Sequence, residues 1–161
     1  MTDKLHLKAT CTLLSNVLEG EYIRILDSST KKESLDEMIR CITSSPSITD
    51  ADGFSEGIFH REDLMSTGIG MSIAIPHVRL ACVKQLVMCV GICKAGIADY
   101  KSLDNEPVKY IFMIGAGKDQ HEQHLKLLSS ISSLLQDEKL RNRLIEAKDE
   151  KEIYEVLINR E

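Results

Sequence analysis

The spacing of hydrophobic residues along this chain changes between the helical repeat and the strand repeat, and it predicts an alternation of helices and strands. The first apolar cluster, at residues 13–18, indicates a short helix or a packed lead-in, and residues 22–26 alternate as a β-strand does. Over residues 34–42 the apolar positions fall at i, i+3, i+4 and i+7, as on one face of a helix. Ser34 with Glu37 predicts a capping box at the start of that helix.

The middle of the chain contains a short apolar strand that a proline interrupts. Residues 73–75 are apolar, and Pro76 restricts both its own backbone and that of the residue before it. The residue that follows is therefore expected at the end of a strand, with little conformational freedom. Upstream, Gly68 and Gly70 permit a tight turn, whereas residues 48–64 have a roughly helical spacing that internal glycines weaken.

Strongly apolar segments later in the chain predict the interior of a sheet. Residues 85–93 and 108–114 are hydrophobic on both faces, which is typical of strands covered by helices on both sides. A turn is expected at residues 95–96, and an apolar stripe over residues 124–135 predicts a helix. Further helices are expected at residues 138–147 and 150–159. The predicted fold is α/β, with a mixed, mostly central sheet between helices in three α/β/α layers.

The composition limits the class of protein. With 161 residues, of which 43% are hydrophobic, one domain with a full core is expected over residues 1–161. The formal net charge of -5 argues against nonspecific binding of nucleic acid. No apolar run approaches a membrane span and no signal-peptide pattern opens the chain, which predicts a cytoplasmic protein with no direct membrane insertion. The 5 cysteines include no C-x-x-C pair, so reduced, mostly buried thiols are expected.

The candidate chemistry centres on His77, the residue that follows Pro76. Arg61 lies upstream of it, and the intervening segment contains hydroxyl groups and the free amides of a turn. A histidine held near such donors and a guanidinium suits a group that receives and releases a phosphoryl anion. The candidate phosphate contacts are Ser66, Thr67, Gly68 and Gly70.

A second histidine, His124, lies on the apolar stripe of a predicted helix. A histidine in such a position is more often a hydrogen-bonded boundary residue than a functional one. If the strand before it runs parallel to the strand before His77, however, both histidines lie at the carboxyl edge of one sheet, where open α/β folds build their sites. His121 lies one helical turn earlier, but two histidines are too few for a zinc site, so neither a metal nor a cofactor is expected.

Several motifs closely resemble those of the IIA components of the phosphoenolpyruvate phosphotransferase system, of the fructose and mannitol type. They are Arg-Glu at residues 61–62, Ser-Thr-Gly-Ile-Gly at 66–70, Ile-Ala-Ile-Pro-His at 73–77 and His-Leu-x-Leu-Leu at 124–128. Standalone members of this family include the nitrogen-regulatory IIA proteins. The resemblance covers essentially the whole chain, and it favours a helix over residues 48–64.

The resemblance implies roles for individual residues. In that family the histidine of Pro-His is phosphorylated, which maps onto His77, and its free ring nitrogen would be Nε2. The arginine of the Arg-Glu motif belongs to the active site and maps onto Arg61, while the second histidine assists and maps onto His124. The chain departs from the family at three positions that often hold a polar residue, a glycine and a small residue. They are Met71, Ser72 and Val78.

The function that the resemblance implies is phosphoryl relay, with an HPr-like phosphocarrier protein as the donor. The chain would then act as a regulator whose phosphorylation selects target proteins, or as a transport component that passes phosphate to a IIB component for a sugar of the fructose or mannitol type. A phosphate-free binding module that retains the motifs is the least favoured alternative, because the arginine and both histidines are present. The chain ends soon after the last IIA-like helix, which favours regulation. The residues do not identify a sugar.

Overall fold

A computed structural model describes residues 2–159, so residues 1, 160 and 161 of the expected domain lie outside the described part. The helices in this part are α1 (Thr2–Val17), η1, a 3-10 turn (Gly20–Tyr22), α2 (Lys31–Ile42), α3 (Ala51–Leu64), α4 (His121–Leu134), α5 (Glu138–Glu146) and α6 (Glu150–Ile158). The strands are β1 (Ile23–Ile25), β2 (Gly68–Gly70), β3 (Ile73–Ala74), β4 (His77–Arg79), β5 (Val87–Ile97) and β6 (Val108–Ala116). None of the helices in residues 2–159 is both long and apolar enough to cross a membrane.

The strands form one mixed sheet with β5 and β6 at its centre. The order is β1-β5-β6-β3-β2, and β4 pairs with β6 beyond the end of β3. The β5–β6 pair is antiparallel, whereas β3 and β4 both run parallel to β6. The register sets His77 opposite Ile114, near the carboxyl end of β6. The condition under which both histidines would lie at the carboxyl edge of one sheet, a parallel arrangement of these strands, is therefore met.

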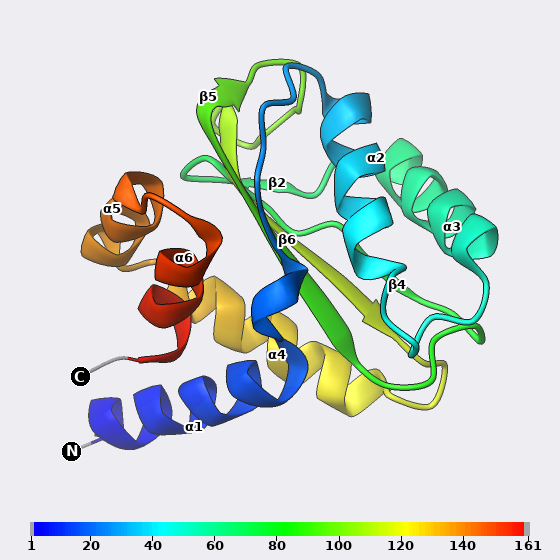
Figure 1. The fold of residues 1–161 in the computed structure, drawn as a ribbon, viewed down its shortest axis with the longest axis horizontal. Coiled ribbons are helices and arrows are strands. Elements are labelled where there is room, and N and C mark those ends of the chain that lie inside the picture. The colour runs from blue at the N-terminus through cyan, green and yellow to red at the C-terminus, as the bar shows by residue number, and fades with distance from the viewer. Residues whose placement is uncertain (1, 160–161) are drawn as a thin grey trace.

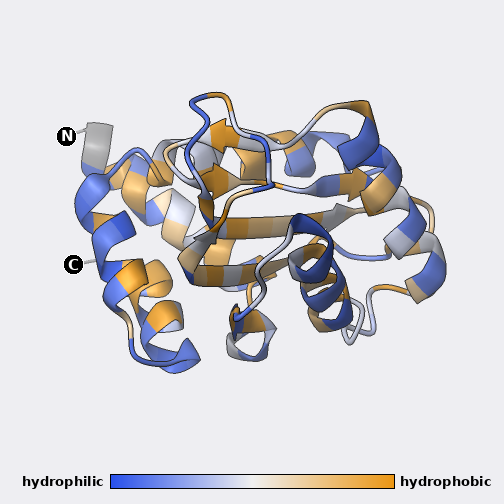
Figure 2. Cartoon of the chain, turned by 90° about the horizontal axis from the view of Figure 1, so that it is seen from above, coloured by the Kyte–Doolittle hydropathy of each residue, from blue (hydrophilic) through white to orange (hydrophobic). Residues whose placement is uncertain are grey.

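Helices cover both faces of this sheet, as Figure 1 shows. In that view α2 and α3 lie on one side, and α1 and α4 lie on the other, with α5 and α6 beside them. The hydropathy colouring of Figure 2 shows hydrophobic strands running through the middle of the molecule, with the hydrophilic parts of the helices outside. The predicted α/β class with a helix-covered mixed sheet is confirmed.

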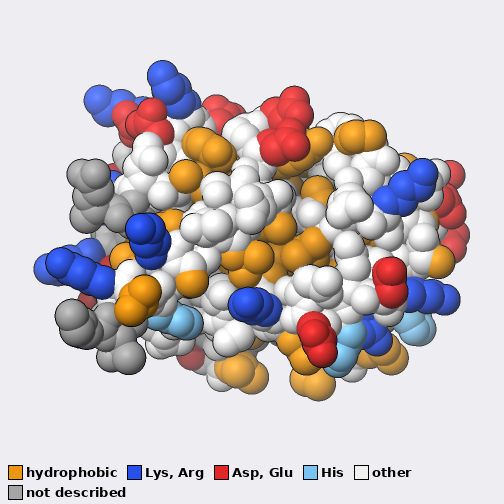
Figure 3. Space-filling model, turned by 90° about the horizontal axis from the view of Figure 1, so that it is seen from below, with side chains coloured by type: hydrophobic (Ala, Val, Ile, Leu, Met, Phe, Trp, Pro, Cys, Tyr) orange, Lys and Arg blue, Asp and Glu red, His pale blue; other side chains and the backbone are white. Residues whose placement is uncertain are grey.

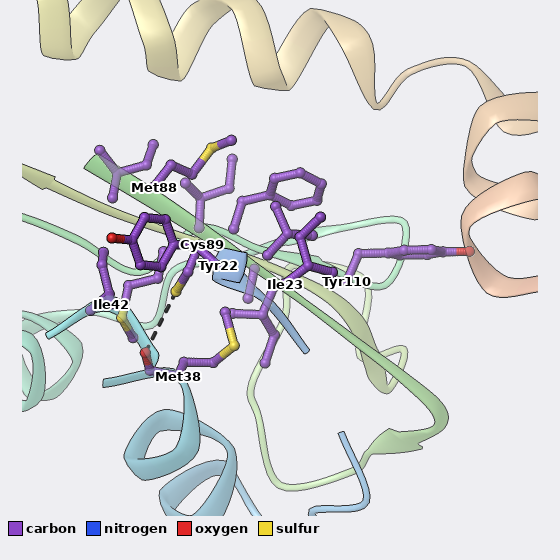
Figure 4. Close-up of a cluster of buried hydrophobic side chains, with 14 of the residues drawn as sticks. Tyr22, Ile23, Met38, Ile42, Met88, Cys89 and Tyr110 are labelled. Carbon is purple, nitrogen blue, oxygen red and sulfur yellow. Dashed lines mark hydrogen bonds between the residues drawn. The ribbon is translucent and has the colours of Figure 1, made fainter. Parts of the chain in front are cut away.

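The core lies between the two central strands and the helices that cover them. Met88 and Cys89 from β5 are completely buried, as are Met38 and Ile42 from α2. The Cys89 Sγ atom lies 3.5 Å from the carbonyl oxygen of Met38, the contact drawn as a dashed line in Figure 4. The two strands that the sequence places in the interior occupy that position, since hydrophobic side chains on both of their faces are covered.

Two boundaries differ from the sequence-based expectation because a stronger local signal lies elsewhere. Helix α2 begins at Lys31 rather than at Ser34, since the side chain of Thr30 accepts a hydrogen bond from the Glu33 amide. The turn expected at residues 95–96 is absent, and β5 continues through it to Ile97. The pairing of β5 with β6 is irregular between Ile92 and Ile97, as at a β-bulge, and Gly96 in this stretch has a positive φ of 82°.

The segment before His77 also differs from the expectation. Gly68 and Gly70 form β2 instead of a turn, and β2 pairs with β3 as an antiparallel hairpin. The hairpin turn consists of Met71 and Ser72, which adopt positive φ angles of 54° and 64°. For residues with a side chain, this left-handed conformation costs roughly 1 kcal/mol each. Gly70, directly before them, also has a positive φ, of 97°, so the conformation that the glycines permit is present at Gly70 and continues through the two turn residues.

His77 does not follow directly from a strand, because β3 ends at Ala74. Ile75 and Pro76 form a link, and His77 is the first residue of β4. Both pieces pair with β6, so Pro76 divides one edge of the sheet into two short strands. Residues 48–64, whose helical spacing is weakened by glycines, contain the helix α3. At its start, the side chain of Asp50 accepts a hydrogen bond from the Gly53 amide.

Candidate functional site

The two candidate histidines meet at the end of the sheet where β6 stops. His77 opens β4 opposite Ile114, and His124 lies in the first turn of α4, the helix that follows β6. The centroids of their rings are 5.4 Å apart, with an interplanar angle of 69°. This is an edge-to-face contact, so the two imidazoles form one structural unit although they are far apart in the sequence.

The orientation of the His77 ring is fixed by the backbone just before it. Its Nδ1 atom lies 2.6 Å from the carbonyl oxygen of Ile75. A carbonyl oxygen only accepts hydrogen bonds, so Nδ1 carries the proton of the neutral ring. The lone pair is therefore on Nε2, the nitrogen that can attack an electrophile.

Both rings are held neutral by their surroundings. Burial lowers the pKa of His77, and the guanidinium of Arg61 lowers it further, while the hydrogen bond to Ile75 opposes them. Burial lowers the pKa of His124 from 6.5 to about 4, with His77, Arg79 and His121 adding to the effect. At neutral pH neither ring carries a charge, so each has one nitrogen with a free lone pair.

The Nε2 atom of His124 is buried and has no hydrogen-bond partner among the described residues. Leaving a buried polar atom without a partner costs about 1–3 kcal/mol. Native proteins keep few such atoms, and those that persist are commonly found where a ligand or a reaction completes the site. His124 therefore has an unused hydrogen-bonding position beside the ring of His77.

A pocket of about 400 Å³ opens in front of these histidines. Its lining includes Arg61 from α3, Arg79 from β4, and His60 and His121 as well as the central pair. No acidic side chain is among its described lining residues, although the whole chain carries 25 acidic and 20 basic residues. The pocket is thus a basic site on an acidic protein, which favours an anion.

Hydrophobic side chains surround the basic ones. Leu64 and Leu125 also line the pocket and are 71% and 53% exposed. In Figure 3, at the end of the molecule opposite the two chain termini, histidine side chains lie among basic, acidic and exposed hydrophobic ones. Exposed hydrophobic side chains next to polar and charged ones are typical of a site that meets another protein.

Of the residues singled out in the sequence, the structure brings Arg61, His77 and His124 together in the pocket. The side chain of Arg61 also donates a hydrogen bond to the carbonyl oxygen of Met65, at a distance of 2.8 Å, and so caps the end of α3. Its guanidinium is near enough to affect the pKa of His77.

The four expected phosphate contacts lie elsewhere, and the hydroxyls and amides that would hold phosphate are used within the protein. The Ser66 hydroxyl donates to the carbonyl oxygen of Lys101, at 2.6 Å, and also accepts from the Gly68 amide. The Thr67 amide donates to Glu62, and the Gly70 amide donates to the Ser102 hydroxyl. None of the four lines the pocket, so the geometry does not support them as phosphate contacts.

Arg79 is a residue of the pocket that the sequence-based reasoning did not select. It lies two positions after His77, and alternate residues of a strand point to the same face, so the spacing contained the necessary signal. His60 and His121 also line the pocket, but only the fold brings them there. Within residues 2–159 no group of three or more His, Cys, Asp or Glu side chains is placed to hold a metal ion.

Comparisons with known proteins agree with one another. The family model described as phosphoenolpyruvate-dependent sugar phosphotransferase system, EIIA 2, matches residues 16–160. A fructose-specific EIIABC component of Bacillus subtilis is 37% identical over 132 residues, which are 82% of this chain but only 21% of that protein. The chain thus spans about a fifth of the length of this relative.

Two further similar proteins are regulators by name. A nitrogen regulatory protein of Pseudomonas aeruginosa is 31% identical over 140 residues, and the match covers 87% of this chain and 90% of that protein. Among solved structures, the nitrogen regulatory protein IIA-Ntr from Neisseria meningitidis superposes with a TM-score of 0.82 at 26% identity. That match covers 90% of this chain and 99% of the other.

Proposed function

The chain belongs to the EIIA 2 family of the phosphoenolpyruvate-dependent sugar phosphotransferase system, and we propose that His77 is the residue on which it carries the phosphoryl group. Components of this family are phosphotransferases that relay phosphoryl groups through a histidine. In our proposal an HPr-like phosphocarrier protein supplies the group, and the chain relays it or uses it as a regulatory signal. Residues 1–161 would form one such domain, acting in the cytoplasm.

The observation that carries this proposal is the neutral His77 ring with its proton on Nδ1, packed against His124 in a pocket whose described lining contains no acidic side chain. Nucleophilic attack needs the free lone pair on Nε2. The incoming phosphoryl group brings negative charge, which the nearby arginines stabilise. Nε2 of His124 has no partner among the described residues, and when it carries the proton of the neutral ring it can donate a hydrogen bond to a phosphate oxygen.

The transfer can be written with few protein steps. The lone pair on Nε2 of His77 attacks phosphorus in line, the new N–P bond forms, and the N–P bond to the carrier histidine breaks. The leaving carrier imidazole takes the electron pair of that bond. The proton on Nδ1 of His77 stays on the ring, because the Nδ1–H group keeps donating its hydrogen bond to the Ile75 carbonyl oxygen. Catalysis then comes from positioning and charge stabilisation.

Two uses of the phosphoryl group fit the family, and regulation is the one we propose. Two of the relatives described above are nitrogen regulatory proteins, and the match covers nearly all of each one. Phosphorylation would add close to two negative charges to the pocket and so change which partner binds over it. The alternative is a transport component that passes phosphate to a IIB component for a fructose- or mannitol-type sugar, which the Bacillus subtilis relative supports.

The test is labelling with phosphoenolpyruvate, the phosphocarrier protein and its upstream kinase from the same organism. The wild type should gain one acid-labile, base-stable phosphoryl group per chain, and His77→Ala should gain none. His6→Ala is the matched control, because His6 is exposed on α1 and outside the pocket, and it should be labelled like the wild type. Stoichiometric labelling of a folded His77→Ala variant would overturn the assignment. Rapid passage of the label to a sugar-specific IIB component would favour transport.

A further inference from the structure

A second buried polar cluster lies behind the site, centred on Glu62, the residue next to Arg61. The side chain of Glu62 is 2% exposed, yet it is a carboxylate. Its Oε1 accepts hydrogen bonds from the hydroxyl groups of Thr67 and Tyr100, the latter at 2.8 Å. Its Oε2 accepts from the Thr67 amide at 3.3 Å and pairs with Lys31 Nζ at 2.9 Å.

This carboxylate and the groups around it come from four separate parts of the chain. Lys31 begins α2, Glu62 lies in the last turn of α3, Thr67 precedes β2, and Tyr100 follows β5. The Lys31 ammonium also lies 4.6 Å from the centre of the Tyr100 ring. Burial, with Glu62 adding to it, raises the pKa of Tyr100 well above its usual value, so its hydroxyl stays protonated and donates.

Thr67 connects this cluster to the site through the backbone. Its carbonyl oxygen accepts a hydrogen bond from the Ile75 amide, at 3.1 Å. The carbonyl oxygen of Ile75 is the atom that holds Nδ1 of His77, at 2.6 Å. A continuous series of hydrogen bonds therefore runs from the buried carboxylate to the ring that would carry the phosphoryl group.

We propose that Glu62 is a positioning residue for phosphoryl transfer, a proposal that rests on the function assigned to His77 above. Its carboxylate holds Thr67, and Thr67 in turn holds Ile75. The Ile75 carbonyl then fixes which nitrogen of His77 is protonated and where Nε2 points. Glu62 acts through these residues and does not line the pocket itself.

The local backbone explains why such support is needed. Ile75 and Pro76 lie between β3 and β4, so the regular ladder of the sheet does not hold the Ile75 amide. Pro76 has a fixed φ and no amide hydrogen of its own. The hydrogen bond to Thr67 is therefore what fixes the start of this link, and Thr67 is 4% exposed and held at both its amide and its hydroxyl.

The test compares Glu62→Gln with Asp36→Asn. Glutamine keeps the shape of Glu62 but has only one oxygen, so it cannot accept from the two hydroxyl groups and from the Thr67 amide and Lys31 at the same time. Asp36→Asn is the matched control, because it also neutralises a carboxylate, one that pairs with Lys32 on the surface of α2 at 2.7 Å. Two measurements are made on each protein: the ring ¹⁵N chemical shifts of unphosphorylated His77 at neutral pH, and the rate of labelling from the phosphocarrier protein.

In the wild type and in Asp36→Asn, the ¹⁵N shifts should show a protonated Nδ1 and a free Nε2. In Glu62→Gln they should show a mixture of the two tautomers, and labelling should slow by about tenfold or more, since small misplacements of reacting groups have effects of this size. A folded Glu62→Gln with wild-type shifts and a wild-type rate would overturn the proposal, even if its stability were reduced.

Two features keep the test decisive. If Glu62→Gln does not fold, Tyr100→Phe removes a single hydrogen bond to the same carboxylate and should shift the tautomer ratio in the same direction. Unchanged shifts in folded Tyr100→Phe would then overturn the proposal. The ¹⁵N measurement needs no phosphoryl donor, so it tests the positioning role even if the labelling experiment shows that another residue carries the phosphoryl group.

Discussion

Glu62 and His124 are both buried polar residues, 5% and 7% exposed, but they differ in how their polar atoms are satisfied. Both oxygens of Glu62 have protein partners, which come from three other segments. The Nε2 atom of His124 has none among the described residues. A fully satisfied buried group rigidifies the backbone around it, whereas an unsatisfied one keeps a bonding position open.

This difference separates support from chemistry within one small region. The Glu62 cluster ties together α2, α3 and the segments that contain Thr67 and Tyr100, and protein donors occupy both oxygens of its carboxylate. The pair of His77 and His124 has the reverse property, because each ring is neutral and one nitrogen of each is available. The following predictions test this contrast, from the largest expected effect to the smallest.

Removing the carboxylate of Glu62 should have the largest effect on stability. Glu62→Ala leaves Lys31 without its partner and the Thr67 amide without its acceptor, so the free energy of unfolding should fall by about 3–5 kcal/mol. Urea denaturation at neutral pH measures this change. Asp36→Ala, which breaks an exposed pair on α2, should cost about 0.5 kcal/mol or less. Equal losses of unfolding free energy in the two variants would show that the ion pair of Glu62 and Lys31 contributes no more than an exposed pair on the surface.

Lowering the pH should destabilise the folded protein through His124. The pKa of His124 is about 4 in the folded protein and 6.5 for an unperturbed histidine, so between these values the unfolded chain binds more protons. Stability from this residue is therefore complete above pH 6.5 and is lost as the pH falls toward 4, by roughly 2–3 kcal/mol.

The comparison protein is His124→Gln, which has no titrating group at this position. Its free energy of unfolding, from denaturant titrations at several pH values, should fall less steeply than that of the wild type over the same range. Parallel curves for the two proteins would show that His124 is not held neutral by the fold. Above pH 7 the two curves should run parallel, because neither protein then takes up a proton at residue 124.

The smallest expected effect comes from a partial change to the satisfied cluster. Tyr100→Phe removes one donor to Glu62 while Thr67 and Lys31 remain, so stability should fall by about 1 kcal/mol. Thermal unfolding followed by circular dichroism is sufficient to measure it. A loss as large as that of Glu62→Ala would mean that the cluster depends on Tyr100 as a whole, and the contrast with His124 would need revision.

Much of the architecture could be predicted because its signals are long. The two interior strands and the helix that contains His124 each extend over many residues with one consistent pattern, so small errors at the ends do not change the assignment. The motifs around His77 and His124 led to the pocket in the same way. Arg61, His77 and His124 meet where the sequence analysis expects them.

Short-range details were harder, and each failure has a physical reason. Glycines best tolerate positive φ, so a tight turn was expected at Gly68 and Gly70; Gly70 does adopt a positive φ of 97°, but the residues between β2 and β3 are Met71 and Ser72. Gly68 is required for a different purpose, since a Cβ atom there would lie 2.2 Å from the carbonyl oxygen of Lys101. The close approach of the Lys101 carbonyl oxygen to Gly68 exists only in the folded protein, so the reason for a glycine at this position could not be predicted from the sequence.

The burial of Glu62 could not be predicted from its neighbours. A glutamate in the last turn of a helix is almost always exposed, and nothing in the local sequence distinguishes this one. Its partners, Lys31, Thr67 and Tyr100, are distributed over a third or more of the chain and meet only in the fold. Because these partners are far apart in the sequence, the bond between the Thr67 hydroxyl and Glu62 could not be foreseen, and Thr67 was expected to contact phosphate instead.

The division of one sheet edge by Pro76 has a further consequence for local unfolding. β4 pairs with β6 on one side and, in the described part of the chain, with no strand on the other, whereas β5 and β6 are paired along most of their length. Short, one-sided elements open with a smaller free energy than the central strands of the same sheet. We therefore expect the strand that begins with His77 to detach and reclose as a unit while the centre of the sheet stays intact. His77, whose ring must be oriented for attack, therefore lies on a short strand that is paired on one side only among the described residues, and its orientation depends on contacts outside that strand.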